Sequence, residues 1–240
     1  MRTLAAAIFL TAATLCNSTF AQSRTGTFSI IPKIGTNISN VTNNKLYIAP
    51  DASDLAVKSK SKAGLVLGAD VQYQATDNVA VSLGVGYSRQ GYRYADYEVP
   101  VATTDEYTEY EGISDCHHNI DYVTIPLMLR CYVTRNLAIG AGVQAAFIVD
   151  NKFSSESTSF KKYKNGMKEY DTTSEKSETE FGSEFLNKCD FSIPVSISYE
   201  YSNVVVAATY DFGLTSIAKK PLPKSRNKVI MFTAGYKFEL

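Results

Sequence analysis

The sequence has no surplus of either charge. Its 240 residues include 24 basic and 24 acidic side chains, and the sequence pI is about 6.7. Proteins that bind nucleic acid usually carry a basic surplus. The charge balance therefore argues against a nucleic-acid partner.

Histidine is almost absent, which limits the catalytic chemistry that the chain can offer. Its two histidines, His117 and His118, lie together in the segment DCHHN (115–119). Neighbouring side chains of an extended chain point to opposite sides, whereas the ligands of a metal must converge on one point. No G-x-S-x-G motif supplies a serine nucleophile. We therefore expect no catalytic residues, no metal site and no cofactor, and we predict that the protein is not an enzyme.

Long hydrophobic runs are also missing. No segment approaches the roughly 18 apolar residues of a transmembrane helix. The longest mainly apolar run, residues 4–15, follows Arg2 and precedes a polar stretch that ends at Ala21. This layout is typical of a secretory signal peptide. It predicts a signal peptide over residues 1–21 and one domain over residues 22–240; a buried N-terminal helix is the alternative.

What the sequence does contain is alternation of apolar residues with small or polar ones. This two-residue period is typical of β-strands, and helical periodicity is absent from the same segments. The alternation predicts an all-β fold with eight strands, near residues 28–38, 63–75, 79–91, 122–133, 137–148, 191–201, 204–214 and 229–239.

The connections between these strands alternate in length. Three are short turns, at residues 76–78, 134–136 and 202–203, and four are long, at residues 39–62, 92–121, 149–190 and 215–228. Outer-membrane barrels place short turns at the periplasmic end and long loops outside the cell. We therefore predict an eight-stranded antiparallel up-and-down transmembrane β-barrel with short periplasmic turns and long extracellular loops.

The two faces of the predicted strands differ in charge. The bulky apolar face is free of charge over the last five strands, whereas the opposite face holds Gly, Ala, Ser, Thr and six charged side chains. An eight-stranded lumen has room for few large side chains, so the apolar face should meet lipid and the polar face should point inward. Buried charges need partners. We predict an interior ion-pair network that closes the lumen; charges at water-filled rims are the alternative. Its members would be Lys33, Asp70, Arg130, Glu200, Asp211 and Lys237.

The long connections carry cysteines and unequal charge. Cys116 and Cys189 each precede a strand at the long-loop end, and exported proteins retain disulfides, so a Cys116–Cys189 bond is possible. Segment 92–121 is rich in acidic residues, whereas segment 215–228 has five basic residues and no acidic one. The basic segment could hold lipid phosphates or an acidic partner; simple exposure to water is the alternative.

Three short motifs resemble one known family. The segments PKIGTNIS (32–39), YVTIPLMLRCYV (122–133) and FTAGYKFEL (232–240) resemble the PorT-like outer-membrane β-barrel proteins of Gram-negative bacteria. The resemblance implies an eight-stranded barrel in the bacterial outer membrane, and some members of that family assist protein secretion. The matching positions are Lys33, Gly35, Asn37, Ile125, Pro126, Leu127, Leu129 and Arg130.

These observations predict a protein that acts structurally or through its extracellular loops. Its partners would be outer-membrane lipid and another membrane or secretion protein that its loops contact, and not nucleic acid. Three alternatives remain open. The barrel could be a small pore, an accessory component of a secretion system, or a soluble periplasmic barrel that binds a ligand.

Overall fold

The computed structural model describes residues 24–240 except 48–55, 172, 181–184 and 221–222. The predicted signal peptide lies outside these residues. No helix in the described part of the chain is both long enough and apolar enough to cross a membrane. The described secondary structure consists of strands, with the bounds β1 (Phe28–Val41), β2 (Lys45–Tyr47), β3 (Ala56–Lys58), β4 (Lys60–Gln74), β5 (Val79–Arg93), β6 (Tyr97–Thr103), β7 (Tyr107–Tyr132), β8 (Leu137–Tyr163), β9 (Lys168–Tyr170), β10 (Glu175–Thr179), β11 (Cys189–Tyr201), β12 (Val204–Gly213), β13 (Asn227–Tyr236) and β14 (Phe238–Glu239).

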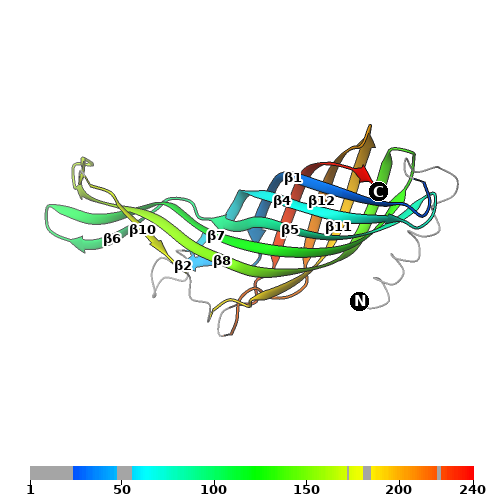
Figure 1. The fold of residues 1–240 in the computed structure, drawn as a ribbon. Helices are drawn as coiled ribbons and strands as arrows, with labels where there is room; N and C mark the ends of the chain where they lie inside the picture. Colours follow the sequence, from blue (N-terminus) through cyan, green and yellow to red (C-terminus); the bar gives the residue numbers. More distant parts are fainter. Residues whose placement is uncertain (1–23, 48–55, 172, 181–184, 221–222) are drawn as a thin grey trace.

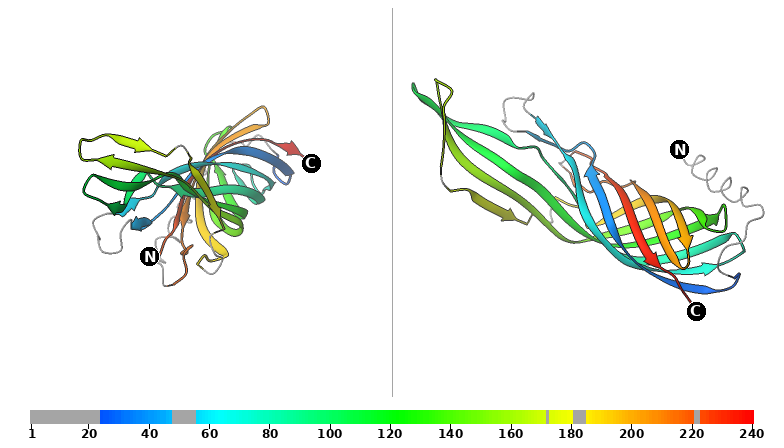
Figure 2. Two further views of the ribbon diagram at one scale, coloured as in Figure 1. Left: turned by 90° about the vertical axis from the view of Figure 1, so that its left-hand side faces the viewer. Right: turned by 90° about the horizontal axis from the view of Figure 1, so that it is seen from above.

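Eight of these strands form a closed ring. They pair in the order β1–β4–β5–β7–β8–β11–β12–β13, and β13 pairs again with β1. Every pairing in the ring is antiparallel. The barrel is seen from the side in Figure 1 and in two further views in Figure 2. The predicted fold class is confirmed.

The first and last barrel strands meet where only glycine fits. Gly35 on β1 pairs with Thr233 on β13. A Cβ atom built at Gly35 would clash with the backbone carbonyl oxygen of Phe232. The absence of a side chain thus lets the two strands approach and close the ring.

The three short turns use local chemistry that suits tight hairpins. Ser202 and Asn203 both have positive φ, 47° and 70°, as a two-residue type I′ turn requires. In the turn at 76–78, the Thr76 hydroxyl accepts hydrogen bonds from the backbone N–H groups of Asn78 and Val79. Thr134 makes the same pair of bonds in the turn at 134–136.

The outer surface of the barrel is apolar. Ile34 is 57% exposed, and Leu83 and Val143 are each 55% exposed. Inward-facing residues such as Asn37 and Gln72 are buried. Water would penalise so large an apolar surface, whereas the lipid of a bilayer matches it. The prediction that the polar face points inward is confirmed, and a soluble barrel is excluded.

Large parts of two predicted long loops, 92–121 and 149–190, are in fact strands. β7 has 26 residues and β8 has 27, whereas β11 has 13. Residues 107–116 and 149–163 continue β7 and β8 past their pairing with β5 and β11, and β6, β9 and β10 join them. We call this extension the arm; it projects to the left of the barrel in Figure 1. The prediction of loops at these positions was therefore wrong, while β7 and β8 keep their predicted barrel segments.

The arm and the barrel meet at a break in register. The pairing of β7 with β8 shifts between Asp121 and Tyr122, and again between Ser114 and His117. Such bulges bend a strand and increase its twist. The first shift lies where β8 ends its pairing with β11, and the second lies where β7 ends its pairing with β5. The two shifts therefore bound the base of the arm.

Candidate functional site

The periplasmic end of the lumen is filled by a buried ion pair. The Lys237 ammonium lies 3.0 Å from both carboxylate oxygens of Glu200, and both side chains are almost fully buried. The Tyr132 hydroxyl donates to Glu200 at 3.4 Å. Tyr132 also packs against Ala80 and Ala138, which come from the starts of β5 and β8. This end of the lumen is therefore filled by side chains.

A second ionic group lies further along the lumen. The Asp70 carboxylate accepts a hydrogen bond from Lys33 at 2.7 Å and one from Arg130 at 3.0 Å. Arg130 also donates to Gln72 at 2.8 Å, and Gln72 donates to the Tyr132 hydroxyl at 3.1 Å. The contacts thus run without a break from Lys33 to the Glu200–Lys237 pair. We call these seven side chains the lumen network: Lys33, Asp70, Gln72, Arg130, Tyr132, Glu200 and Lys237.

Asp211 does not take part in the lumen network. It lies toward the long-loop end of β12 and is 2% exposed. Gln144 donates a hydrogen bond to it at 3.1 Å, and no salt bridge joins it to another described residue. Asp211 faces the lumen as predicted, but the prediction that it joins the ion-pair network was wrong, because the cations of the lumen lie nearer the periplasmic end.

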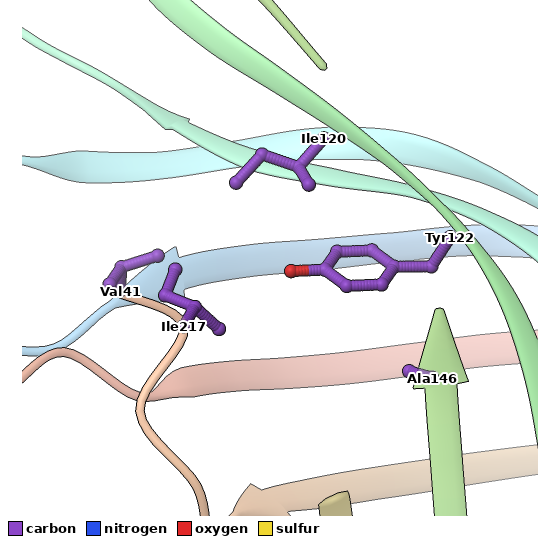
Figure 3. Close-up of a cluster of buried hydrophobic side chains, with 5 residues drawn as sticks. All are labelled: Val41, Ile120, Tyr122, Ala146 and Ile217. Carbon is purple, nitrogen blue, oxygen red and sulfur yellow. The ribbon is translucent and has the colours of Figure 1, made fainter. Parts of the chain in front are cut away.

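The extracellular mouth of the barrel is closed by apolar side chains. Five buried residues form the mouth cluster, shown in Figure 3: Val41, Ile120, Tyr122, Ala146 and Ile217. Ile217 comes from the connection between β12 and β13. Its N–H donates to the Ser225 carbonyl at 2.8 Å, and its carbonyl accepts from the Asn187 N–H at 2.8 Å. These bonds hold the connection across the mouth.

Polar contacts surround the mouth cluster on the lumen side. Asn227 donates to the Tyr122 hydroxyl at 3.0 Å and to Asp190 at 3.0 Å. Asp190 also accepts a hydrogen bond from Thr215. A small cavity lies inside the barrel, and Asp70, Arg130 and Gln144 are among its lining residues. The lumen is therefore a short chamber with side chains packed at both ends.

The arm is held together by charge and aromatic contacts between its own strands. Lys168 on β9 forms a salt bridge with Glu98 on β6 at 2.8 Å. Phe160 stacks on Tyr110 with a centroid distance of 5.3 Å and contacts Tyr170 at 5.1 Å. The Lys168 ammonium lies 4.7 Å from the centre of the Phe160 ring. The acidic segment 92–121 thus faces basic residues of segment 149–190.

The two histidines lie at the base of the arm and are both held by neighbours. His118 is 1% exposed, and its Nδ1 lies 3.0 Å from the Tyr92 hydroxyl. Burial lowers the pKa of His118 to about 4, so the ring is neutral at neutral pH. The Nδ1 of His117 lies 2.7 Å from the Asp115 carbonyl oxygen. Among the described residues, no group of three or more His, Cys, Asp or Glu side chains is placed to bind a metal.

The predicted disulfide is absent, since Cys116 and Cys189 are both free thiols. Cys116 precedes His117, which pairs with Ser154 of β8, whereas Cys189 pairs with Phe147 of β8. Those β8 residues are seven positions apart, which is about 23 Å along a strand. A disulfide needs Cα atoms within about 7 Å. The prediction was wrong because Cys116 belongs to the arm and Cys189 to the barrel rim.

A comparison with protein-family profiles identifies an outer-membrane β-barrel family. The profile of a family described as "Outer membrane protein beta-barrel domain" matches residues 20–219. A search of curated proteins finds no match by sequence.

Solved structures of outer-membrane proteins are also similar. The Ail protein of Yersinia pestis has a TM-score of 0.40 at 12% identity, over 89% of this chain and 99% of that one. Neisserial surface protein A has a TM-score of 0.40 at 9% identity, over 88% and 97%. OprG of Pseudomonas aeruginosa has a TM-score of 0.37 at 10% identity, over 91% and 99%.

Proposed function

Because the chain belongs to the outer membrane protein β-barrel domain family, we propose that it is a closed, non-enzymatic barrel that acts outside the cell through its arm. The protein lies in the bacterial outer membrane, and its long connections are extracellular. The observation that carries the proposal is the length of β7 and β8, about twice that of β11. A barrel that only crosses the membrane needs strands of about 9–11 residues.

The packing of the lumen supports a barrel that does not conduct. The Glu200–Lys237 pair fills the periplasmic end, and the mouth cluster fills the extracellular end. An ion crossing this path would have to displace both groups. Displacing one partner of a buried ion pair is costly because the other charge is left without compensation.

The contacts of the histidines support a non-enzymatic role. A general base must be within hydrogen-bond reach of the group that it deprotonates. His118 is buried against Tyr92, and His117 contacts the backbone and the carboxylate of its neighbour Asp115. Neither contact involves a serine, threonine or cysteine nucleophile.

The arm offers apolar side chains to a partner outside the cell. Val101, Met167 and Tyr170 are 63%, 56% and 58% exposed, respectively. Exposed apolar and aromatic side chains on a rigid support are common features of binding surfaces. The partner would be another protein, because β6 and β10 also lie at the ends of the strand order and so offer unpaired backbone groups.

The likeness to PorT-like proteins suggests a narrower second candidate. It rests on Lys33, Gly35 and Asn37 in β1 and on the segment 125–130 in β7. On that basis the partner of the arm would be a component of a protein secretion system. This role differs from the general proposal only in the identity of the partner.

Ion conductance in a planar lipid bilayer tests the closed lumen. Purified, detergent-folded protein should insert without producing steady current. The variant E200Q, which removes the charge that neutralises Lys237, should also stay silent because the mouth cluster is intact. Steady current from the unaltered protein would identify a small pore and overturn the closed-lumen proposal.

Photo-crosslinking in living cells tests the role of the arm. A photoreactive residue at Tyr170 or Met167 should give an adduct of one defined size. The matched control is Arg135, an exposed residue of the short turn at 134–136, which should give no adduct of that size. Equal adducts from all three positions, or none from the arm, would contradict the proposal.

A further inference from the structure

The outward face of β13 changes from apolar to cationic at the extracellular rim. Along one extended segment, alternate residues point outward. The outward residues nearer the membrane centre are the apolar Phe232 and Ile230, and those that follow toward the rim are the cationic Lys228, Arg226 and Lys224. Phe232 is 48% and Ile230 is 39% exposed. The alternate residues, at 225, 227 and 229, are buried. Three successive cations therefore stand directly above the lipid-facing surface.

The backbone that carries these cations is fixed to the end of β1. The Thr42 N–H donates to the Arg226 carbonyl at 2.9 Å, and the Arg226 N–H donates to the Thr42 hydroxyl at 2.9 Å. The Asn43 amide donates to the Lys224 carbonyl at 3.2 Å. These bonds anchor residues 224–228 on the rim, so the three side chains keep a defined position relative to the barrel wall.

The same three cations line a groove with two aromatic residues. The groove is bounded by Lys224, Arg226 and Lys228 together with Tyr210 and Phe212 of β12. The two rings contact each other at 4.3 Å, and Phe212 pairs with Lys228 across the strands. Aromatic side chains of membrane proteins concentrate at the level of the lipid headgroups. We call this feature the basic groove.

The cations of the basic groove lack the carboxylate partners found elsewhere on the rim. Arg89 forms a two-pronged salt bridge with Asp121, both bonds being 2.9 Å. No salt bridge of the described residues involves Lys224, Arg226 or Lys228. An anion from outside the chain would supply the missing charge.

We propose that the basic groove binds the phosphate of a lipid in the outer leaflet of the membrane. Lysine and arginine are the usual ligands of phosphate oxygens, and arginine offers two parallel hydrogen bonds. The acyl chains of the same lipid would lie along Ile230 and Phe232, directly below the cations. A free phosphate has no acyl chains that could contact this apolar surface. The groove therefore fits a phospholipid or phosphorylated glycolipid better than a free phosphate. The proposal does not depend on a closed lumen or on a partner for the arm.

Binding of labelled lipid A to the detergent-folded protein tests the proposal. The variant K224Q/R226Q/K228Q removes three charges from exposed positions, so the barrel should still fold and show heat-dependent mobility on a gel. Each cation near a charged lipid contributes to binding, so the triple variant should bind lipid A at least about tenfold more weakly. The single variant R226Q should show a smaller loss.

The matched control is K161Q/K162Q/K164Q, which removes the same charge from the arm. It should bind lipid A as the unaltered protein does. An equal loss in both triple variants would mean attraction to overall charge and would overturn the proposal, as would unchanged binding in K224Q/R226Q/K228Q. Inorganic phosphate should fail to compete at concentrations well above that of the lipid. Full competition by phosphate would identify a free-anion site instead.

Discussion

The strands β7 and β8 pass through two environments, and their two halves differ accordingly. From Leu137 to Ala146, β8 alternates between exposed or half-buried residues and buried ones. From residue 151 to 159 its side chains are nearly all half-buried on both faces. The barrel half has lipid on one side and the lumen on the other, whereas the arm has water on both sides. The comparison shows that strand pairing can continue after the apolar alternation has ended.

Different interactions therefore stabilise the two halves. In the barrel, the Glu200–Lys237 pair is buried, and Gly35 is in close contact with the backbone of β13. In the arm, salt bridges such as Lys168–Glu98 are partly exposed to water. Exposed pairs contribute little to stability because water and salt screen them. Substitutions of matched type should thus have large effects in the barrel and small effects in the arm.

The largest difference is expected for glycine substitutions. G35A should prevent closure of the barrel, because the new Cβ would clash with the Phe232 carbonyl oxygen. G112A adds the same atom in the arm, where the nearest neighbouring atom would lie 3.5 Å away, and it should leave the barrel intact. Gel mobility of unheated samples in detergent measures the folded fraction. A folded G35A barrel would show that the seam can widen.

The second largest difference between barrel and arm is expected when one partner of an ion pair is removed. K237M leaves the Glu200 carboxylate buried without its cation, which should lower the free energy of unfolding by about 3–5 kcal/mol. The double variant E200L/K237M should recover much of this loss. K168M in the arm should have no measurable effect on barrel unfolding. Urea titration in lipid vesicles measures all three, and equal effects for K237M and K168M would contradict the distinction between enclosed and exposed pairs.

The smallest expected effect is a pH dependence confined to the arm. Burial lowers the pKa of His118 from 6.5 to about 4. The unfolded chain therefore binds a proton on this ring at a higher pH than the folded arm does. The stability of the arm should be complete above pH 6.5 and fall as the pH drops from 6.5 toward 4, by about 1.4 kcal/mol at pH 5.5.

Hydrogen exchange of the β7 and β8 amides in the arm measures this change. The variant H118F should show no fall over the same pH range, and the barrel amides should not respond in either protein. A pH response of the barrel and arm together would assign the titration to other groups.

The barrel was predictable because lipid and lumen impose opposite demands on alternate residues. That contrast located all eight barrel strands and the inward face of Lys33, Asp70 and Glu200. The arm was not predictable from the same pattern, because segments such as SSESTSFKKY (154–163) are polar on both faces. Its strands depend on pairing between distant segments, which a two-residue period in one segment does not reveal.

The contacts inside the lumen were predictable only in part. The alternation of residues along each strand predicted which charged side chains face the lumen. The hydrogen bonds that link them through Gln72 and Tyr132 depend on the shape of the interior. Ile217 could not be found from the sequence, because it lies in an irregular connection and its burial results from how that connection folds over the mouth.

The uninterrupted pairing of β7 with β8 also gives the molecule a mechanical property. Ten residues of β7, 107–116, extend past the last residue that pairs with β5, which is a reach of about 33 Å along the strand. The arm is in this sense a lever fixed at one end in the membrane. A force applied at its tip exerts its greatest bending moment at the base, in the region bounded by the two register shifts.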